Sequence, residues 1–369
     1  MAKVCADVAQ GFCPQRLTTT NLSSRMNALV ELRKLVAPPD LAIDLGTAYT
    51  RLFTQRHGLL VEEPTMVHQA DGAITAVGLN AARRQNLDPS LETASPVCGG
   101  FVRDAHAVGT LLRTLLHQSA PGAWSLGSRF IRALVCLPSQ ATHEERANIL
   151  AAVRAAGIAS ATPVSQALAA AIGAGLDVAS PYAQLVVDIG AGTTEIAIVR
   201  SGAIVQAQTL RIASGAMHRA VQQNISSLHR LRLSLREAEL LTRAVGFTGY
   251  LTEERTFLSR GYEFGSGQPL NFYVSSFDVA EALLPAGQQL LQAIHQFIQN
   301  LEPELACEVI ESGLMLAGGG ALLPGLSERL AQLTGLAVKV APEPLRATVL
   351  GAGQMLQVSA ATGLWAKAS

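Results

Sequence analysis

The sequence predicts an α/β fold built from two similar halves. One motif occurs twice, as LAIDLGTAYT at 41–50 and LVVDIGAGTT at 185–194, so that Asp44 matches Asp188. Elsewhere, apolar stretches of strand length alternate with segments of helical periodicity, which is typical of an α/β fold with largely parallel sheets. Of the 369 residues, 49% are hydrophobic and 15% are charged. This composition predicts a large buried core, and the length favours two to three domains.

Each copy of the motif predicts a β-hairpin. An apolar run is followed by an acid, a glycine-containing turn and a second run with β character, 51–54 in the first copy and 195–200 in the second. An apolar strand that presents a lone carboxylate and bare backbone at a turn can approach a phosphate and its metal ion. Two such hairpins predict two halves that grip one nucleotide from opposite sides.

The remaining elements follow from periodicity and turn residues. In the first half we expect strands within 61–78 with a turn at Asp71-Gly72, a helix over 105–118, a strand over 132–137, a helix over 139–156 with Ser139 or Thr142 as N-cap, and a small-residue helix over 164–176. In the second half we expect a helix over 217–245, a β-rich segment over 252–274, a helix over 276–301, strands over 313–317 and 337–340, and a helix over 326–333. The uncharged segment 347–366 contains too much Gly, Gln and Ser for a membrane span, and it predicts a buried helix.

A third glycine element lies between the strand at 313–317 and the helix at 326–333. Gly318, Gly319 and Gly320 lack a Cβ, so a planar base or a phosphate can lie against their backbone. A flexible turn explains a Gly-Gly-Gly run about equally well. Its position behind two matched hairpins favours a nucleotide site.

Composition excludes several classes of function. Net charge is zero and no Lys/Arg run is present, so we expect no nucleic-acid partner. The five cysteines are scattered, and neither they nor the eight histidines show the spacing of a zinc site. A reduced cytoplasmic compartment is therefore expected. Residues 1–25 lack the apolar stretch of a secretory signal.

Three stretches together resemble a known superfamily: DLAIDLGTAYT (40–50), LVVDIGAGTTEIAIVRSGAIV (185–205) and LMLAGGGALLPGLSERLAQLTGLAVKVAPEPL (314–345). In order and spacing they resemble the actin, sugar-kinase and heat-shock-chaperone ATPases, and within these the MreB family of bacterial actins. The resemblance covers roughly residues 40–358. It implies a two-lobed actin-like ATPase fold with a duplicated ribonuclease-H-like core, in which each lobe carries a smaller inserted subdomain. The implied boundaries are a lead at 1–39, lobe I at 40–181 plus 348–369, and lobe II at 182–347.

The resemblance also implies a binding site for ATP or ADP with Mg²⁺, which Asp44 and Asp188 would order through its waters. The phosphates would be held by backbone amides and hydroxyls of Gly46, Thr47, Gly190, Ala191, Gly192, Thr193 and Thr194. The adenosine would be held by Gly318, Gly319, Gly320 and Leu322, with Glu239 at the ribose.

Several positions depart from the family pattern. Where the family has Glu-Glu-Pro, with the first Glu positioning the attacking water, this chain has Ser165-Gln166-Ala167. A serine cannot act as a carboxylate base, which leaves Gln166 and Thr193 as the candidate catalytic residues, with the Gln166 amide able to orient a water. The other departures are Tyr49 for Asn, Ala191 for Gly, Ala213 for Gly and Thr242 for Lys. Since phosphoryl transfer depends on positioning, we expect weak ATP hydrolysis at most.

The implied biology is a filament of this protein that assembles head to tail beneath the cytoplasmic membrane and acts with cell-wall synthesis proteins in cell-shape determination. Candidate membrane contacts are Leu29, Leu32, Leu35 and Val36 on one face of a helix at 26–36, and Trp124 and Leu126 in a loop. A surface helix or tail, and a Trp124 that covers a core edge, are the alternative interpretations. The alternative function is a hydrolysis-deficient scaffold or regulator of another filament. A small-molecule kinase is a weaker third hypothesis, because no catalytic Asp in a sugar-binding context is visible.

Overall fold

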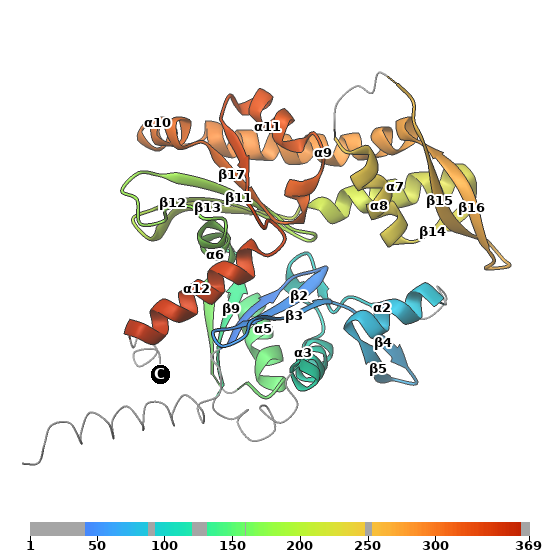
Figure 1. Ribbon diagram of the computed structural model, residues 1–369, viewed down its shortest axis with the longest axis horizontal. Coiled ribbons are helices and arrows are strands. Elements are labelled where there is room, and N and C mark those ends of the chain that lie inside the picture. The colour runs from blue at the N-terminus through green and yellow to red at the C-terminus, as the bar shows by residue number, and fades with distance from the viewer. Residues whose placement is uncertain (1–40, 88–92, 120–130, 159, 248–252, 363–369) are drawn as a thin grey trace, which may run out of the picture. The chain divides into compact units, whose positions relative to one another are not determined.

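The computed structural model describes residues 41–87, 93–119, 131–158, 160–247 and 253–362 (Figure 1), and of 86–87 and 358–362 it describes the backbone alone. These residues all belong to one unit of the chain, 39–369. The candidate membrane residues Leu29, Leu32, Leu35, Val36, Trp124 and Leu126 lie outside the described residues. Among the described helices, none combines the length and apolar character needed to cross a bilayer.

The first sheet has five strands in the order β10-β9-β1-β2-β3. Its strands are β1 (Leu41–Leu45), β2 (Tyr49–Thr54), β3 (Gly58–Pro64), β9 (Arg132–Leu137) and β10 (Ser160–Ser165). β1, β2 and β3 form an antiparallel meander, whereas β1, β9 and β10 run parallel to one another. Tight turns force the antiparallel half, because only antiparallel neighbours can be joined by a few residues.

The second sheet repeats this arrangement, in the order β13-β12-β11-β17-β18 (Figure 1). Its strands are β11 (Gln184–Ile189), β12 (Thr194–Arg200), β13 (Ala203–Leu210), β17 (Leu314–Ala317) and β18 (Val338–Val340). Again the first three are antiparallel, and β11, β17 and β18 are parallel. The duplicated halves are therefore confirmed, while the expectation of largely parallel sheets was wrong: each sheet is mixed.

Each half also contains a small antiparallel sheet between its main elements. In the first half β4 (Val67–Ala70), β5 (Ala73–Val77) and β6 (Thr93–Ala94) pair in the order β5-β4-β6, beside α2 (Gly78–Leu87). In the second, β14 (Leu231–Leu233), β15 (Thr256–Glu263) and β16 (Pro269–Ser275) pair in sequence order. β7 (Val97–Cys98) and β8 (Phe101–Val102) form a two-stranded antiparallel ribbon. The two three-stranded sheets correspond to the predicted insertions, although the exact domain boundaries stay a prediction.

Most helices lie where periodicity places them. They are α3 (Ala105–Ser119), α5 (His143–Ala155), α6 (Gln166–Gly173), α7 (Ser214–His229), α8 (Leu235–Val245), α9 (Ser276–Gln299), α10 (Pro303–Ser312), α11 (Leu326–Thr334) and α12 (Ala347–Thr362). Thr142 is the N-cap of α5 and forms a reciprocal capping box with Glu145. The single helix expected over 217–245 was wrong. The chain leaves the helical conformation at Arg230, with φ of 54°, and inserts β14 between α7 and α8 because that strand pairs with β15.

Two helices rich in small residues, α6 and α12, pack directly on each other between the sheets (Figure 1). Alanines of α6 contact β11 and β12 in one small-residue cluster, whereas α12 packs on β1, β2 and β9. At their crossing, a Cβ on Gly173 would overlap the Ala347 carbonyl, and one on Gly351 would overlap the Ala169 carbonyl. Glycine at these two positions lets the backbones touch. Through this contact, the helix that packs on the second sheet meets the helix that packs on the first sheet.

Candidate functional site

The two sequence motifs fold into hairpins with the same turn. In the first hairpin (β1 and β2) the Gly46 N–H donates to the Tyr49 carbonyl at 3.0 Å, and in the second hairpin (β11 and β12) the Gly190 N–H donates to the Thr193 carbonyl at 2.9 Å. Asp44 and Asp188 occupy the same place in their strands, one residue before the strand ends. The turn chemistry predicted from the sequence is thus present in both copies.

The turns of the two hairpins lie against each other. A Cβ on Gly192 would overlap the Thr47 hydroxyl, and Thr47 Oγ1 accepts a hydrogen bond from the Gly100 amide at 2.9 Å. Gly100 in turn faces Thr193, since a Cβ on it would lie 2.7 Å from Thr193 Cγ2. Thr47 and Gly192, which are 145 positions apart in the sequence, therefore meet in one place, as the expectation of two converging hairpins requires.

Both acids are buried, with Asp44 8% and Asp188 3% exposed. Burial raises the pKa of Asp44 to about 6; Arg51 opposes the rise, and the negative charge of Asp188 adds to it. Burial also raises the pKa of Asp188, against hydrogen bonds from Gln166 and Thr348. The charge of Arg51 lowers the pKa of both carboxyl groups, and the charge of Asp188 raises the pKa of Asp44. The structure therefore brings the two predicted acids close enough to interact electrostatically.

Asp188 is the point where four elements meet. Its Oδ2 accepts from Gln166 Nε2 of α6 at 3.0 Å and from Thr348 Oγ1 of α12 at 3.1 Å. The glycine loop lies on the other side, because a Cβ on Gly318 would overlap Asp188 Oδ1. Gly318 adopts φ of 79°, which favours glycine. β17 delivers this loop to the acid, since Ala317 pairs with Asp188.

The glycine loop is thus next to the second hairpin. Gly319, Gly320 and Leu322 form the 3₁₀ turn η2 (Gly319–Leu322), and Leu322 is 42% exposed. The second turn is also braced by the N-terminus of α7, where the Ser214 N–H donates to the Gly190 carbonyl and the Gly215 N–H donates to the Ala191 carbonyl, both at 3.1 Å.

Other predicted residues have structural partners. Thr194 is fully buried and its hydroxyl donates to the Ile212 carbonyl at 2.7 Å, so that proton is not free for a phosphate. The buried Thr242 hydroxyl donates to the Ala238 carbonyl of its own helix at 2.7 Å. Glu239 pairs with Arg243 at 2.7 Å on α8 and acts electrostatically on His218 of α7. The predicted roles of Thr194 and Glu239 in nucleotide binding stay predictions.

The departures from the family pattern have clear local roles. Ser165 is the N-cap of α6, accepting from the Leu168 amide, and its hydroxyl lies 3.2 Å from the Ser139 hydroxyl. Tyr49 is 42% exposed, and the Arg51 guanidinium lies 5.4 Å from its ring centroid. No side chain at position 165 thus supplies a carboxylate, while Gln166 points its amide nitrogen at Asp188.

Sequence reasoning missed two buried charged residues. The strand register places Arg51 opposite Asp44 and Glu195 opposite Asp188, so they are equivalent positions of the two motif copies. Glu195 is fully buried; its Oε2 accepts from the Ser139 amide at 2.9 Å, and its Oε1 has no partner among the described residues. The sequence did contain a signal for both residues: each is a charged residue within an otherwise apolar strand, seven positions after the acid of its motif copy. On a buried sheet such a residue seldom faces solvent.

Arg51 belongs to a charged network that joins the first sheet to the start of α12. Its Nη1 lies 3.6 Å from Asp44 Oδ2, and its Nε donates to Glu62 Oε1 at 2.9 Å. Arg346 donates from Nη2 to Glu62 Oε2 at 2.7 Å and pairs with Glu343 at 3.4 Å. These contacts hold a guanidinium beside the carboxylate for which the sequence predicted Mg²⁺.

The charges around Asp44 and Asp188 limit how a metal ion could bind there. The described residues contain no group of three or more His, Cys, Asp or Glu side chains that could hold a metal ion. Two carboxylates are enough for a hydrated Mg²⁺ that also binds phosphate. However, an ion at Asp44 would have to share that carboxylate with Arg51, so these residues are a poor fit to the predicted Mg²⁺.

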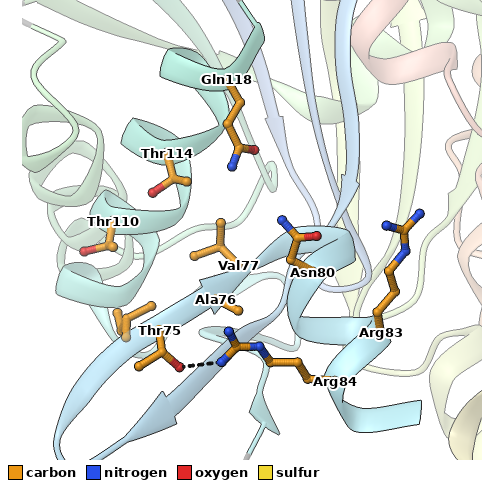
Figure 2. Close-up of a pocket in the computed structure, with 10 residues that line it drawn as sticks. Thr75, Ala76, Val77, Asn80, Arg83, Arg84, Thr110, Thr114 and Gln118 are labelled. Carbon is orange, nitrogen blue, oxygen red and sulfur yellow. Dashed lines mark hydrogen bonds between the residues drawn. The ribbon is translucent and has the colours of Figure 1, made fainter. Parts of the chain in front are cut away.

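A cavity of about 390 Å³ lies elsewhere, between β5, α2 and α3 (Figure 2). Figure 2 shows Thr110, Thr114 and Gln118 on one side of it and Asn80, Arg83 and Arg84 on the other, with Arg84 hydrogen-bonded to Thr75 at 3.1 Å. It contains none of the predicted site residues. We therefore locate the candidate nucleotide site at the paired hairpins, on the chemistry of their residues.

Comparison with known proteins agrees with the geometry. The MreB/Mbl protein family matches residues 38–363. The chain is 31% identical over 326 residues to the cell shape-determining protein MreB of Escherichia coli K12, covering 86% of this chain and 93% of that protein. It is 30% identical over 321 residues to the cell shape-determining protein Mbl of Bacillus subtilis 168, covering 86% and 95%.

Solved structures confirm the predicted actin-like fold. MreB5 of Spiroplasma citri bound to ADP superposes with a TM-score of 0.77 at 24% identity, covering 87% of this chain and 96% of that one. A MamK double helical filament superposes with a TM-score of 0.69 at 22% identity, covering 86% and 99%. With the family match spanning nearly all of the chain and the paired hairpins in place, the chain belongs to the MreB/Mbl family of bacterial actins.

Proposed function

We propose that this chain is a cytoskeletal, cell-shape-determining actin of the MreB/Mbl family that binds ATP or ADP between its two hairpins and polymerises head to tail. The observation that carries the proposal is the meeting of both motif turns with the Gly318 loop around Asp44 and Asp188. Bare amides in glycine turns suit phosphate oxygens, and a glycine loop suits a planar base. The family membership, and the filament described for MamK, support self-assembly.

In this proposal the turn amides of Gly46, Thr47, Gly190, Ala191 and Gly192, with the Thr193 hydroxyl, hold the phosphates. Thr194, which the resemblance adds to this set, donates its proton to the Ile212 carbonyl instead. Leu322 and the three glycines beside it hold the adenosine, with Glu239 at the ribose. The Mg²⁺ ion predicted at Asp44 and Asp188 would supply positive charge to the phosphates, but there it competes with the Arg51 guanidinium.

We place the protein at the inner face of the cytoplasmic membrane, with residues 26–36 and the loop around Trp124 as the membrane contacts. Cell-wall synthesis and shape proteins are the expected partners. The support is the amphipathic pattern of 26–36 and the family.

Binding and polymerisation are tested separately. Nucleotide binding is measured by fluorescence titration with an ATP analogue, in the wild type, in Asp188→Ala and in the control Asp177→Ala, an exposed acid on a loop. We expect Asp188→Ala to lose binding and Asp177→Ala to keep it. Polymers are then sought by pelleting and electron microscopy, with and without anionic vesicles. A wild type that binds no nucleotide, or that forms no polymer under any of these conditions, contradicts the proposal.

A hydrolysis-deficient scaffold is the second candidate function, and Ser165 is the specific observation that favours it. The position of the family's water-positioning Glu holds a helix N-cap whose hydroxyl is already hydrogen-bonded. Tight nucleotide binding without measurable phosphate release would support this candidate. Robust phosphate release that Asp188→Ala abolishes would exclude it.

A further inference from the structure

The two hairpins are not equivalent in charge. Across from Asp188 the second hairpin places an acid, Glu195, whereas across from Asp44 the first hairpin places a cation, Arg51. Cross-strand partners in register lie on the same face of a sheet. Arg51 therefore extends from β2 on the face that carries Asp44. Asp188 is also close enough for the positive charge of Arg51 to lower its pKa, against the larger rise caused by burial.

The guanidinium of Arg51 is held in place. The side chain is 10% exposed, and its Nε is fixed by Glu62, which is itself held by two nitrogens of Arg346. The ring of Tyr49 also contacts the cation, with its centroid 5.4 Å from the guanidinium carbon. With Nε engaged by Glu62, the terminal nitrogen Nη1 lies 3.6 Å from Asp44 Oδ2. This distance is that of an ion pair and is longer than a normal hydrogen bond, so the cation lies beside the acid without a short hydrogen bond to it.

Two buried carboxylates next to a binding site for a triphosphate need a compensating cation, because each unpaired charge in a dry site is costly. In the predicted arrangement, a hydrated divalent ion supplies that charge. A planar guanidinium suits phosphate oxygens bidentately and remains charged at every accessible pH. Arg51 already stands beside Asp44, where a divalent ion would meet repulsion from it.

We propose that Arg51 takes the place of the divalent ion in this chain, so that the nucleotide phosphates bind to a built-in guanidinium and binding does not require Mg²⁺. The inference rests on the proposed nucleotide site and adds to it a specificity: the preferred ligand is the metal-free nucleoside di- or triphosphate. Glu62 and Arg346 act as positioning residues for Arg51. The same cation next to Asp44 also accounts for the poor fit of the predicted metal site.

The test is equilibrium binding of ADP and of a non-hydrolysable ATP analogue, measured by titration calorimetry in millimolar Mg²⁺ and in excess EDTA. For the wild type we expect dissociation constants in the two conditions to agree within about threefold, far less than the loss of a charge-assisted contact would cause. In Arg51→Leu we expect affinity in EDTA to fall by about tenfold or more, the worth of one charge-assisted hydrogen bond, and Mg²⁺ to restore it in part. Arg51→Lys keeps the charge but loses the planar guanidinium, so it should bind in EDTA more tightly than Arg51→Leu and more weakly than the wild type.

The matched control is Arg154→Leu, which removes an exposed cation of α5 that lies outside the charged network of Arg51, Glu62 and Arg346. It should change binding in EDTA much less than Arg51→Leu does. Thermal melting of each variant verifies folding, and the wild-type comparison stands even if Arg51→Leu does not fold. Wild-type binding in Mg²⁺ that is lost in EDTA overturns the inference and leaves the proposed function intact. Absence of wild-type binding in both conditions overturns both.

Discussion

Replacing Gly351 by alanine should destabilise the protein and disturb the candidate site at once. A Cβ there would overlap the Ala169 carbonyl and lie 2.7 Å from the Gly173 nitrogen, both backbone atoms of α6. An ordinary contact begins at 3.4 Å, so α6 and α12 must separate by at least about 0.7 Å, the difference between these distances. Backbone atoms in helices cannot rotate away as a side chain can.

The separation reaches Asp188 because each helix holds it by one hydrogen bond, Gln166 from α6 at 3.0 Å and Thr348 from α12 at 3.1 Å. Overpacking costs about 1–3 kcal/mol, and a hydrogen bond to a charged group is worth about 1.5–3 kcal/mol. Alanine in a helix recovers about 1 kcal/mol relative to glycine. We therefore expect the free energy of unfolding to fall by about 3 kcal/mol if one of the two hydrogen bonds breaks.

Gly353→Ala on the same helix is the matched control. Its Cβ would meet the ring of Phe53 at 2.5 Å, which is a half-buried side chain that can move, and it gains the same helix propensity. Urea unfolding at neutral pH should show a large loss for Gly351→Ala and a change within about 1 kcal/mol for Gly353→Ala. If Gly351→Ala unfolds at the same urea concentration as Gly353→Ala or higher, the close-contact reasoning is refuted.

Three further predictions concern the first turn of α5 and one buried acid. Thr142→Ala removes the capping hydroxyl of α5 and should lower the free energy of unfolding by about 1 kcal/mol, measured by urea titration against the exposed Glu144→Ala. Partial burial opposes ionisation of Glu145, but hydrogen bonds from the Thr142 amide and Arg211 outweigh burial and hold the pKa of Glu145 below 4.5. The stability that this carboxylate contributes should therefore be lost as pH falls below 4.5. Glu145→Gln should weaken that pH dependence in melting curves from pH 3 to 7. Burial raises the pKa of Glu195 above 4.5, so ionisation of this side chain destabilises the folded state at neutral pH. Glu195→Gln should raise the melting temperature at pH 7 and have no such effect below pH 4.5. An equal shift of the melting temperature at both pH values would contradict the buried-charge explanation.

The sequence determined the elements that depend on neighbouring residues. The two Asp-x-Gly hairpins, the Thr142 cap and the small-residue character of α6 are local patterns, because strand alternation, turn torsions and caps involve residues within a few positions. The repetition of one motif was enough to predict two equivalent halves, and the repeated sheet order confirms them. The helix over 217–245 was wrong for the complementary reason: its interruption at Arg230 serves a strand pairing with residues about thirty positions away.

The charges that surround Asp44 and Asp188 are set by long-range packing and strand register. Arg51 and Glu62 are eleven residues apart, Glu62 and Arg346 are 284 apart, and Glu195 and Ser139 are 56 apart. No local periodicity encodes such partners, since they are brought together by sheet register and by the crossing of α6 and α12. The sequence therefore determined that two acids converge on one site, and packing determined that one of them already has a cation beside it.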